Sequence, residues 1–387
     1  MDTTQIVLLA VFGLGAMLNL AQLTFYFINR AVLSRTGRLA LVDVWPSVDV
    51  CIPARDEEPN IERCVRSLML QDYPGQFRIS VLDDESSDRT AEIVQGLART
   101  DNRVKLIDGK PEPLQPGWIG KVWANTRLGR LATGDFLLFV DADTFFDPSM
   151  LRTAIACAHQ PSNPAVGLFS GYLRFEQSTF WEGSLMASFF ASQHMLPLPF
   201  ALKRKAGGPA PGHWHLFRRD IYERVGGYAK VWNCVLDDME TSGVVNRAGF
   251  LTRLLPLERM GGVRMYRTFS EIWWGVQKSI GYTLQKSWIN ALGLVFVMAL
   301  SGVLPFFAPV IGFWRGWLAP EAIAAFSSLV AILLWRALIQ LDQTGPWWGF
   351  LTHPIMAVFL ALNGLHGVAA LRFGQGVVWK GRSYDRR

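Results

Sequence analysis

The sequence predicts an α/β domain built on a mostly parallel sheet and bracketed by membrane helices. From Val48 onward, short apolar runs alternate with segments of helical periodicity, a pattern typical of parallel sheets with right-handed crossovers. Long apolar runs stand near both ends of the chain, and a spanning helix needs about 20 apolar residues. Hydrophobic residues make up 50% of the 387 residues and charged residues only 18%, a balance that indicates a membrane protein.

The chain opens with an apolar run, Ile6–Ile28, that is long enough to span a bilayer. No basic residue precedes it, unlike the start of a cleaved signal peptide, so we expect a membrane anchor over residues 1–30. A cluster of arginines follows in Arg30–Arg38, and basic residues mark the cytoplasmic side of a span. We therefore expect the next domain, 45–262, to lie in the cytoplasm, attached to the inner membrane.

Within this domain, hydrophobic periodicity and turn residues predict alternating strands and helices. The expected strands are Val48–Ile52, Phe77–Leu82, Val104–Ile107, Phe136–Val140 and about 166–175. The expected helices lie near 61–69, 93–97, 121–132, 150–158 and 180–195.

The segment 263–287 mixes Trp, Tyr, Arg and Lys with apolar residues. This composition predicts an amphipathic helix in the membrane interface, the alternative being an ordinary surface helix. Membrane segments are expected over 288–371, followed by a basic cytoplasmic tail, 372–387.

Three apolar stretches make up the C-terminal membrane segments. The loop Asp342–Trp348 has no basic residue and is expected outside. The charges agree best if the first stretch, broken by Pro305 and Pro309, is a re-entrant hairpin followed by two spans. Arg336, near the end of its span, is expected to snorkel to the interface.

A candidate metal site, Asp141-Ala-Asp143, ends the apolar run Phe136–Val140. Residues two apart on an extended chain point the same way, so both carboxylates are expected to face one point beyond the strand, where open α/β sheets bind ligands. Two hard oxygen donors suit Mg²⁺ or Mn²⁺ carrying a phosphorylated substrate. The alternative is an acidic turn after a buried strand.

Two further acidic pairs, Asp83-Asp84 and Asp237-Asp238, suggest that the three acidic sites have different roles. One carboxylate binds a base or ribose, a pair of carboxylates binds the metal, and one carboxylate deprotonates a nucleophile. Transfer from a nucleoside-diphosphate donor to a hydroxyl needs all three. No GxxxxGK[ST] or GxGxxG stretch is present, which disfavours a P-loop kinase or a Rossmann dehydrogenase. Nucleic acid is not an expected partner, because there is no basic stripe with interleaved aromatic residues.

Four motifs together resemble the inverting family 2 glycosyltransferases of A-type fold: Pro53-Ala-Arg-Asp-Glu-Glu58, Leu82-Asp-Asp-Glu-Ser-Ser-Asp88, Pro116-Gly-Trp-Ile-Gly-Lys121 and Val140-Asp-Ala-Asp143. The resemblance implies a mixed, mostly parallel sheet that binds a nucleotide sugar. Further motifs resemble the membrane subgroup that glycosylates carotenoids and similar isoprenoid lipids: the Gly-Trp-x-Gly-Lys element, Val263-Arg-Met-Tyr-Arg267 and Trp379-Lys-Gly-Arg-x-Tyr384.

The resemblance also implies roles for individual residues. It assigns nucleotide-sugar binding to Pro53, Ala54, Arg55, Glu57, Asp83, Asp84, Lys121 and Asp141. It assigns metal binding to Asp141 and Asp143. Asp238 takes the general-base position, and Asp237 stands beside it where the family usually has Glu.

The family's common Gly-Gln element before the base is replaced here by Gly212-His213-Trp214, a departure that bears on acceptor or sugar choice. His213 and His215, at i and i+2, could share a face and add a metal ligand, but a structural or stacking role is favoured. Candidate acceptor-side residues are His213, Trp214, Arg264, Tyr266, Trp273 and Lys278.

These features predict a non-processive glycosyltransferase that moves one sugar from a UDP-glucose-like donor to a lipid such as a carotenoid or another isoprenoid. The mechanism implied is metal-assisted direct displacement. Processive synthases carry a GlnXXArgTrp motif, which is lacking downstream of Asp238. Alternative acceptors are polyprenyl phosphate, a hopanoid or a ceramide-like lipid. A different class, a membrane scaffold that binds a nucleotide without transferring sugar, is the remaining alternative.

Overall fold

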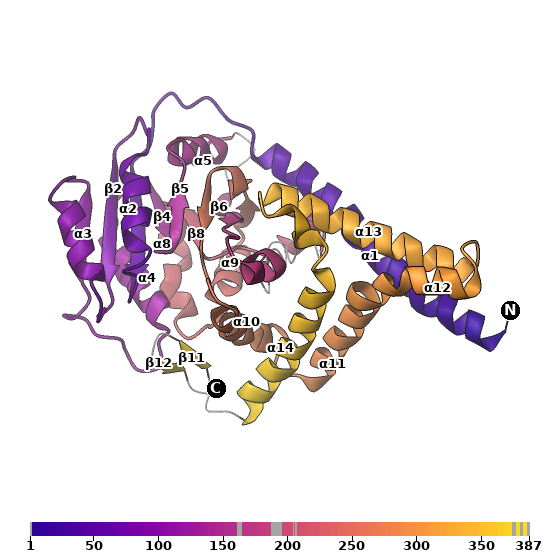
Figure 1. Ribbon diagram of the computed structural model, residues 1–387. Helices are drawn as coiled ribbons and strands as arrows, with labels where there is room; N and C mark the ends of the chain where they lie inside the picture. The colour runs from indigo at the N-terminus through magenta and orange to yellow at the C-terminus, as the bar shows by residue number, and fades with distance from the viewer. Residues whose placement is uncertain are drawn as a thin grey trace.

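The computed structural model is organised around a seven-stranded sheet (Figure 1), and it describes residues 2–160, 165–186, 196–203, 205, 207–373, 377–379 and 382–384. The strand order is β3-β2-β1-β4-β8-β6-β9. Strands β3, β2, β1 and β4 run parallel to one another, and β8 runs antiparallel to both of its neighbours. The prediction of a mixed, mostly parallel sheet is confirmed.

Strands and helices alternate over the first half of the domain, as predicted. The strands of the main sheet are β1 (Val48–Ala54), β2 (Phe77–Asp83), β3 (Val104–Asp108), β4 (Phe136–Val140), β6 (Val166–Ser170), β8 (Trp214–Arg218) and β9 (Leu251–Leu254). The helices of this domain are α2 (Ile61–Met69), α3 (Thr90–Ala98), α4 (Gly120–Leu131), α5 (Met150–Ala158), α7 (Leu198–Ala201), α8 (Arg219–Val225) and α9 (Asp237–Arg247). Single turns of 3₁₀-helix are η2 (Gly227–Val231) and η3 (Leu257–Arg259).

Helices cover both faces of the sheet, which is why β4 is buried along its whole length. Leu138 and Val140 join a core with residues of α2, α3 and α5, whereas Leu137 and Phe139 join a second core with residues of α4 and α8. Neighbouring strand residues point to opposite faces. A strand covered on both faces therefore needs an unbroken apolar run.

The region expected as one strand over 166–175 contains two. The chain leaves β6 at Ser170 and then forms β7 (Arg174–Phe175), which belongs to a separate small sheet with β10 (Gly261–Val263) and β5 (Thr144–Phe146). The helix expected over 180–195 is described only at its start, as a π-helical turn η1 (Glu182–Met186), and residues 187–195 lie outside the described residues.

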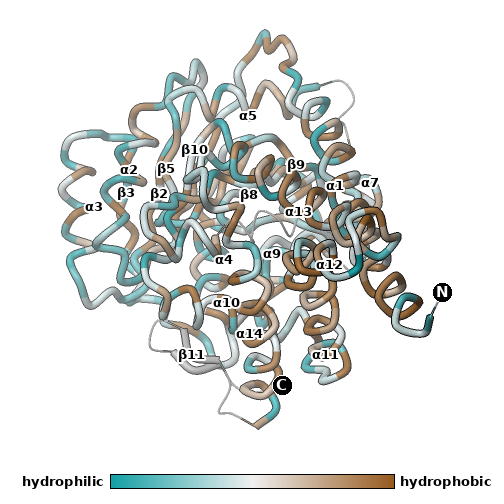
Figure 2. The backbone as a smooth tube through the Cα atoms, turned by 45° about the vertical axis from the view of Figure 1, so that its right-hand side comes forward, coloured by the Kyte–Doolittle hydropathy of each residue, from teal (hydrophilic) through white to brown (hydrophobic). Residues whose placement is uncertain are grey.

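Four helical segments are long and apolar enough to cross a membrane: α1 (Thr3–Thr36), Trp288–Arg315, α13 (Pro320–Asp342) and α14 (His353–Phe373). Their mean hydropathies are 2.1, 2.3, 2.1 and 1.7. Figure 2 shows hydrophobic colour along these segments and mostly hydrophilic colour over α2 and α3. The chain thus combines a mostly parallel α/β sheet domain with helices suited to a bilayer.

Ion pairs mark the two ends of the α1–α13 pair. At one end, Arg30 of α1 reaches Glu258 of the sheet domain (2.7 Å) and Asp342 of α13 (3.5 Å). At the other end, Arg315 contacts Asp2 (3.5 Å) and Glu321 at the start of α13 (3.0 Å). The two helices therefore run in the same direction, and both finish at the sheet domain (Figure 1).

The expectation that the loop Asp342–Trp348 lies on the side opposite to the sheet domain is wrong. The side-chain oxygen of Gln343 accepts a hydrogen bond from the backbone N–H of Phe175 (2.8 Å), and Trp348 stacks on Phe180 with ring centroids 5.5 Å apart. Direct packing on the domain holds this loop in place. These contacts determine the position of the loop, which has none of the basic residues by which a cytoplasmic loop is usually recognised.

The segment 288–315 does not form the expected hairpin. Its helical turns follow one another without a reversal: α11 (Trp288–Val297), a π turn η4 (Met298–Val303), a 3₁₀ turn η5 (Leu304–Phe307) and α12 (Ala308–Arg315). Pro305 lies at the start of the 3₁₀ turn, where proline needs no N–H partner and bends a helix rather than reversing it. The contact between Arg315 and Asp2 places the end of this segment far from the sheet domain along α1.

The expected interfacial segment contains α10 (Phe269–Thr283), which packs beside α14. Ile272 and Val276 are buried, while Trp274 is 57% exposed. The position of α10 in a membrane interface and the cytoplasmic placing of the tail stay predictions. Of the tail, the structure describes strand β11 (Val377–Trp379), which pairs with β12 (Arg382–Tyr384). A short 3₁₀ turn, η6 (Trp347–Phe350), lies between α13 and α14.

Candidate active site at the carboxyl edge of the sheet

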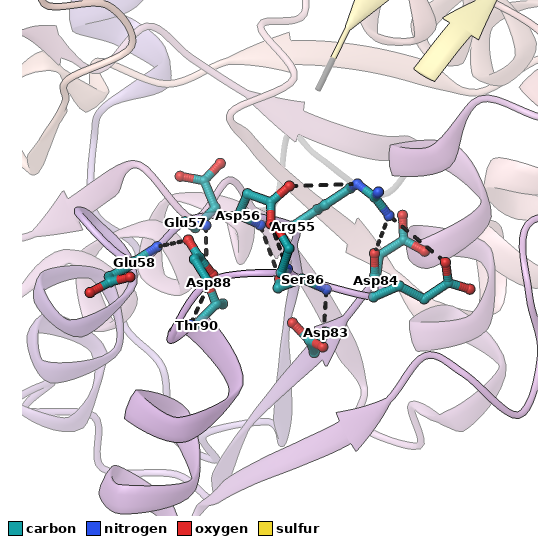
Figure 3. Close-up of polar contacts among 11 residues, drawn as sticks. Arg55, Asp56, Glu57, Glu58, Asp83, Asp84, Ser86, Asp88 and Thr90 are labelled. Atoms are coloured by element: carbon teal, nitrogen blue, oxygen red, sulfur yellow. Dashed lines mark hydrogen bonds and ion pairs between the residues drawn. The ribbon is translucent and has the colours of Figure 1, made fainter. Parts of the chain in front are cut away.

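The loops that leave β1 and β2 are joined by Arg55 (Figure 3). Strands β1 and β2 pair in register up to Ala54 and Asp83, so their following loops start side by side. Arg55 donates a hydrogen bond to the carbonyl oxygen of Asp84 (2.7 Å) and lies 4.0 Å from the Glu85 carboxylate. Two segments predicted to bind the nucleotide are thereby brought together.

Both loops contain a residue in the left-handed region, Asp56 with φ 50° and Glu85 with φ 61°. Such backbone is costly for residues other than glycine and concentrates at ligand-binding sites. Asp56 is held by bonds from the backbone and hydroxyl of Ser87, at 2.7 and 3.0 Å. The strained loops are therefore fixed before any ligand arrives.

Not every residue predicted for the nucleotide presents its side chain there. The Ala54 methyl group is 2% exposed and packs in the core, so only its backbone can face a ligand. Glu57 is turned toward the start of α2, where one of its carboxylate oxygens accepts from Asn60 (3.0 Å). Asp83 is 7% exposed and accepts from the backbone of Ser86 (3.4 Å). The nucleotide roles of these residues and of Pro53 stay predictions.

A second group of candidate residues lies around Lys121. This lysine lies in the first turn of α4, and its Nζ is 2.6 and 2.8 Å from the two carboxylate oxygens of Asp141, directly after β4. The same Nζ donates to the carbonyl oxygen of Gly212 (3.2 Å). A Cβ added at Gly212 would lie 3.1 Å from the Cβ of Asp238 and 3.5 Å from the lysine Nζ. Segments far apart in sequence thus bring a cation and two carboxylates to one place.

The electrostatics of this group suit acid–base chemistry. Burial raises the pKa of Asp238 to about 6, with a further rise from Asp237, while the Met239 N–H and Lys121 oppose the shift. Burial lowers the pKa of Lys121, but the negative charges of Asp141, Asp237 and Asp238 outweigh it, so the net shift is upward and the lysine stays protonated. Asp238 is therefore more basic than an ordinary carboxylate.

The Asp141-Ala-Asp143 stretch is a turn, so the expected extended geometry is wrong. The backbone N–H of Thr144 donates to the Asp141 carbonyl (3.2 Å), and its hydroxyl donates to the same oxygen (2.6 Å). The Asp143 carbonyl accepts from the N–H of Arg264 (3.1 Å). Burial raises the pKa of Tyr266, and the negative charges of Asp143 and Asp141 raise it further.

A metal ion would be held only in part by the protein. Across the residues that the structure describes, no three carboxylate, imidazole or thiol side chains gather into a metal-binding group. The available metal ligands are the carboxylates of Asp141 and Asp143, and Asp141 also forms an ion pair with Lys121. Hard oxygens of this kind fit Mg²⁺ or Mn²⁺ if the diphosphate of a substrate completes the coordination.

The two histidines have separate partners and do not form a shared metal face. Nε2 of His213 lies 3.2 Å from both the Leu173 N–H and the Gly171 carbonyl. His215 is bound by the Tyr228 hydroxyl and the Ala210 carbonyl, each at 2.9 Å. Burial lowers the pKa of each imidazole to about 4. Both rings are therefore neutral near pH 7.

The acceptor-side candidates are spread over several surroundings. Trp214 is the first residue of β8, and its side chain is 0% exposed and packs in the core, so it cannot face an acceptor and that expectation is wrong. Trp273 donates from Nε1 to His366 of α14 (3.1 Å). The side chain of Lys278 lies outside the described part of the chain. Arg264 pairs with Glu182 (3.0 Å) and so faces η1.

Glu182 is a functional candidate that sequence reasoning missed. It is 0% exposed and accepts from the backbone N–H groups of Ser178 and Thr179, at 3.0 and 2.7 Å, besides its pair with Arg264. The signal was a single carboxylate within the aromatic stretch Phe180–Met186. A buried charge must be paired, so its presence there pointed to a fixed partner.

Comparison with known proteins identifies the family. The model of glycosyl transferase family 2 matches residues 49–226. A curated N-acetylglucosaminyltransferase from Bradyrhizobium elkanii is 33% identical over 132 residues, which cover 34% of this chain and 68% of that protein. The chain belongs to glycosyltransferase family 2.

Other relatives match over a smaller share of their length. An N-acetylglucosaminyltransferase from Rhizobium sp. (strain N33) is 31% identical over 175 residues, 45% of this chain and 37% of that protein. The chain spans about a third of the length of the first curated relatives it matches. A mannosyltransferase from Pyrobaculum calidifontis, solved with GDP-Man and Mn²⁺, shares the fold, with a TM-score of 0.51 and 18% identity over 92% of this chain and 99% of that one.

Proposed function

We propose that this protein is a membrane-embedded, non-processive, inverting glycosyltransferase. It moves one sugar from a nucleoside-diphosphate donor to a hydrophobic lipid acceptor such as a carotenoid or another isoprenoid. The observation that carries the proposal is the meeting of Lys121, Asp141 and Asp238 at the carboxyl edge of the sheet, next to the loops that hold Arg55.

In this proposal, Asp238 is the general base that takes the proton of the acceptor hydroxyl as it attacks the sugar. Its raised pKa of about 6 leaves it ionised near pH 7 and brings it closer to the ideal for proton transfer. Asp237 contributes by raising that pKa. Lys121 holds a permanent positive charge beside the position where negative charge develops on the leaving diphosphate.

A bound divalent metal would neutralise part of the diphosphate charge, with Asp141 and Asp143 as its protein ligands. Mg²⁺ and Mn²⁺ both fit this donor set. The Mn²⁺ in the Pyrobaculum calidifontis mannosyltransferase supports the expectation.

The helices explain why the acceptor is proposed to be a lipid. Of the four segments suited to a bilayer, α1, α13 and α14 contact the domain that carries the site, and segment 288–315 packs on the other helices. An acceptor dissolved in the membrane would reach the site from them. The donor sugar is proposed to be glucose on UDP. The relatives named N-acetylglucosaminyltransferase make N-acetylglucosamine a second candidate donor sugar.

The test is donor turnover by purified protein in detergent with Mg²⁺ or Mn²⁺. UDP-glucose, UDP-N-acetylglucosamine and GDP-mannose are offered with a total lipid extract, and released nucleotide and new lipid masses are followed. Asp238→Asn and Asp143→Ala are the test variants. Asp220→Asn, on an exposed carboxylate of α8, is the matched control.

A metal-dependent lipid product heavier by one sugar, lost in both test variants and kept in the control, supports the proposal. Its mass also identifies the sugar. Nucleotide binding without transfer to any lipid would refute it and favour the scaffold alternative.

A further inference from the structure

One face of the membrane helix α13 carries the polar side chains of Arg336 and Gln340, and the residue that caps the helix, Gln343, follows on the same face at a spacing of three. They are 0%, 3% and 1% exposed. Arg336 therefore does not snorkel to the interface as its position suggested. Intramembrane polar side chains that face the protein interior mark functional sites by default.

This polar face is turned toward the sheet domain and the start of α14. Gln340 donates to the side-chain oxygen of Gln177 (2.8 Å), and Arg336 donates from Nη2 to the carbonyl oxygen of Gly349 in η6 (3.2 Å). The ring of His353, the first residue of α14, lies 6.2 Å from that of Trp335. Arg336 is thus enclosed by protein and does not face the lipid side of the helix.

Hydrogen-bond donors outnumber acceptors among the unpartnered buried atoms of this region. Within the described residues, the donors Arg336 Nε and Nη1, Trp335 Nε1, Gln177 Nε2 and Gln343 Nε2 have no hydrogen-bond partner, whereas the unpartnered atoms that could accept are Gln340 Oε1 and His353 Nδ1. Across the same described part of the chain, no carboxylate pairs with the Arg336 guanidinium. A buried cation without a counter-charge costs several kcal/mol or more. Such a set of donors is suited to an anion.

The region is connected to the candidate active site by a short chain of contacts. A Cβ added at Gly349 would lie 2.8 Å from the carbonyl oxygen of Gly183. The preceding residue, Glu182, pairs with Arg264 (3.0 Å), whose backbone N–H donates to the Asp143 carbonyl (3.1 Å). The surroundings of Arg336 and the candidate metal turn are therefore joined through Gly349, Glu182 and Arg264.

We propose that Arg336 and the donors around it bind an anionic group, a phosphate or a carboxylate, on the lipid acceptor. This group is separate from the hydroxyl that receives the sugar. A guanidinium presents paired N–H donors that match the oxygens of such a group. The inference rests on the proposed function, and it narrows the acceptor from any isoprenoid alcohol to a lipid that carries a negative charge.

The test compares two probes that differ only in the anion, farnesyl phosphate and farnesol, bound to the full-length protein in a neutral detergent. Binding is read from tryptophan fluorescence, because Trp335 adjoins Arg336 in the sequence, and Trp335→Phe checks the origin of the signal. The variants are Arg336→Gln and Arg336→Lys. Arg315→Gln, at the opposite end of the membrane helices, is the matched control because Arg315 already has Glu321 as partner.

Wild-type protein is expected to bind farnesyl phosphate about tenfold or more tightly than farnesol, since hydrogen bonds to a charged group are worth at least that ratio. Arg336→Gln should reduce the preference to about twofold or less, Arg336→Lys should keep part of it, and Arg315→Gln should keep all of it. A thermal midpoint that is unchanged or raised in Arg336→Gln supports a ligand role, because an unpaired charge is removed. A lowered midpoint with the preference intact would show a structural role.

Equal binding of the two probes by wild-type protein overturns the inference. Transfer of sugar to neutral lipids alone would also overturn it while leaving the proposed function standing. If the phosphate preference is present and lost in Arg336→Gln, but sugar is transferred to no lipid, the anion site stands and the proposed function fails.

Discussion

Replacing Asp238 by Asn should stabilise the protein while abolishing sugar transfer. The pKa of Asp238 rises from its ordinary value of 3.8 to about 6 in the folded state. At about 1.4 kcal/mol per pKa unit, this rise corresponds to about 3 kcal/mol of unfavourable free energy near pH 7. Partial solvent access and the shared charge of Asp237 reduce the expected gain from removing the carboxylate to about 1–2 kcal/mol.

The sign follows from proton linkage. A carboxyl group whose pKa is raised by folding binds its proton more tightly in the folded state. Its destabilising effect is therefore absent below about pH 4, grows as the pH rises toward 6, and is constant above that. Asp238→Asn should differ in stability from wild type near pH 7 and converge with it near pH 4.

The assay is denaturant or thermal unfolding in detergent at several pH values, with Asp220→Asn as control. In parallel, kcat/KM of the wild-type enzyme should fall about tenfold per pH unit below pH 6, as the base becomes protonated. A destabilised Asp238→Asn variant, or activity that is flat from pH 5 to pH 8, would refute the assignment of Asp238 as a buried base.

Three further changes test other parts of the structure. Gly212→Ala should lower kcat about tenfold or more, because the new methyl group would lie 3.1 Å from Asp238; Gly96→Ala, where a Cβ meets nothing within 4 Å, should leave kcat unchanged. Asp143→Ala should raise the Mn²⁺ concentration needed for half-maximal turnover about tenfold or more, measured by titration with Mn²⁺. An unchanged concentration would show that Asp143 is not a metal ligand. Asn19→Leu removes hydrogen bonds to the Ser301 carbonyl and the Ser328 hydroxyl, both at 3.0 Å, and should lower the free energy of unfolding by about 1 kcal/mol. An equal or greater free energy of unfolding would show that this contact does not hold α1 to its neighbours.

The sequence predicted most of the parallel half of the sheet, because there each element repeats a simple pattern. The run Phe136–Val140 is buried on both faces and matches β4 residue for residue. The helical spacing of Ile61, Cys64, Val65 and Leu68 likewise predicted α2, and all four are buried. Periodicity reports burial, so it works wherever one face or both faces of an element are covered.

The antiparallel half was harder to predict. Strand β8 enters the sheet between β4 and β6, and the stretch 166–175 divides between two sheets. These choices depend on partners more than 40 residues away in the sequence, and short strands carry little periodicity of their own. Local propensity could not decide them.

For the membrane segments, composition determined where the helices are but not how they lie. Apolar runs located α1, α13 and α14 correctly. Charge counting misplaced the loop after α13, because contacts of Gln343 and Trp348 with the sheet domain hold that loop. The position of Arg336 near the end of its span suggested that it snorkels, whereas tertiary packing encloses the guanidinium.

The sequence by itself determined the chemical types at the site: three acidic pairs, one lysine and the loops that carry them. Only the tertiary structure decided that Lys121 pairs with Asp141, that Gly212 brings Asp238 to the same place, and that Glu182 anchors Arg264. The physical reason is that composition and spacing act along the chain. Charge pairing and pKa shifts instead depend on distances of a few ångströms between residues that only the fold brings together.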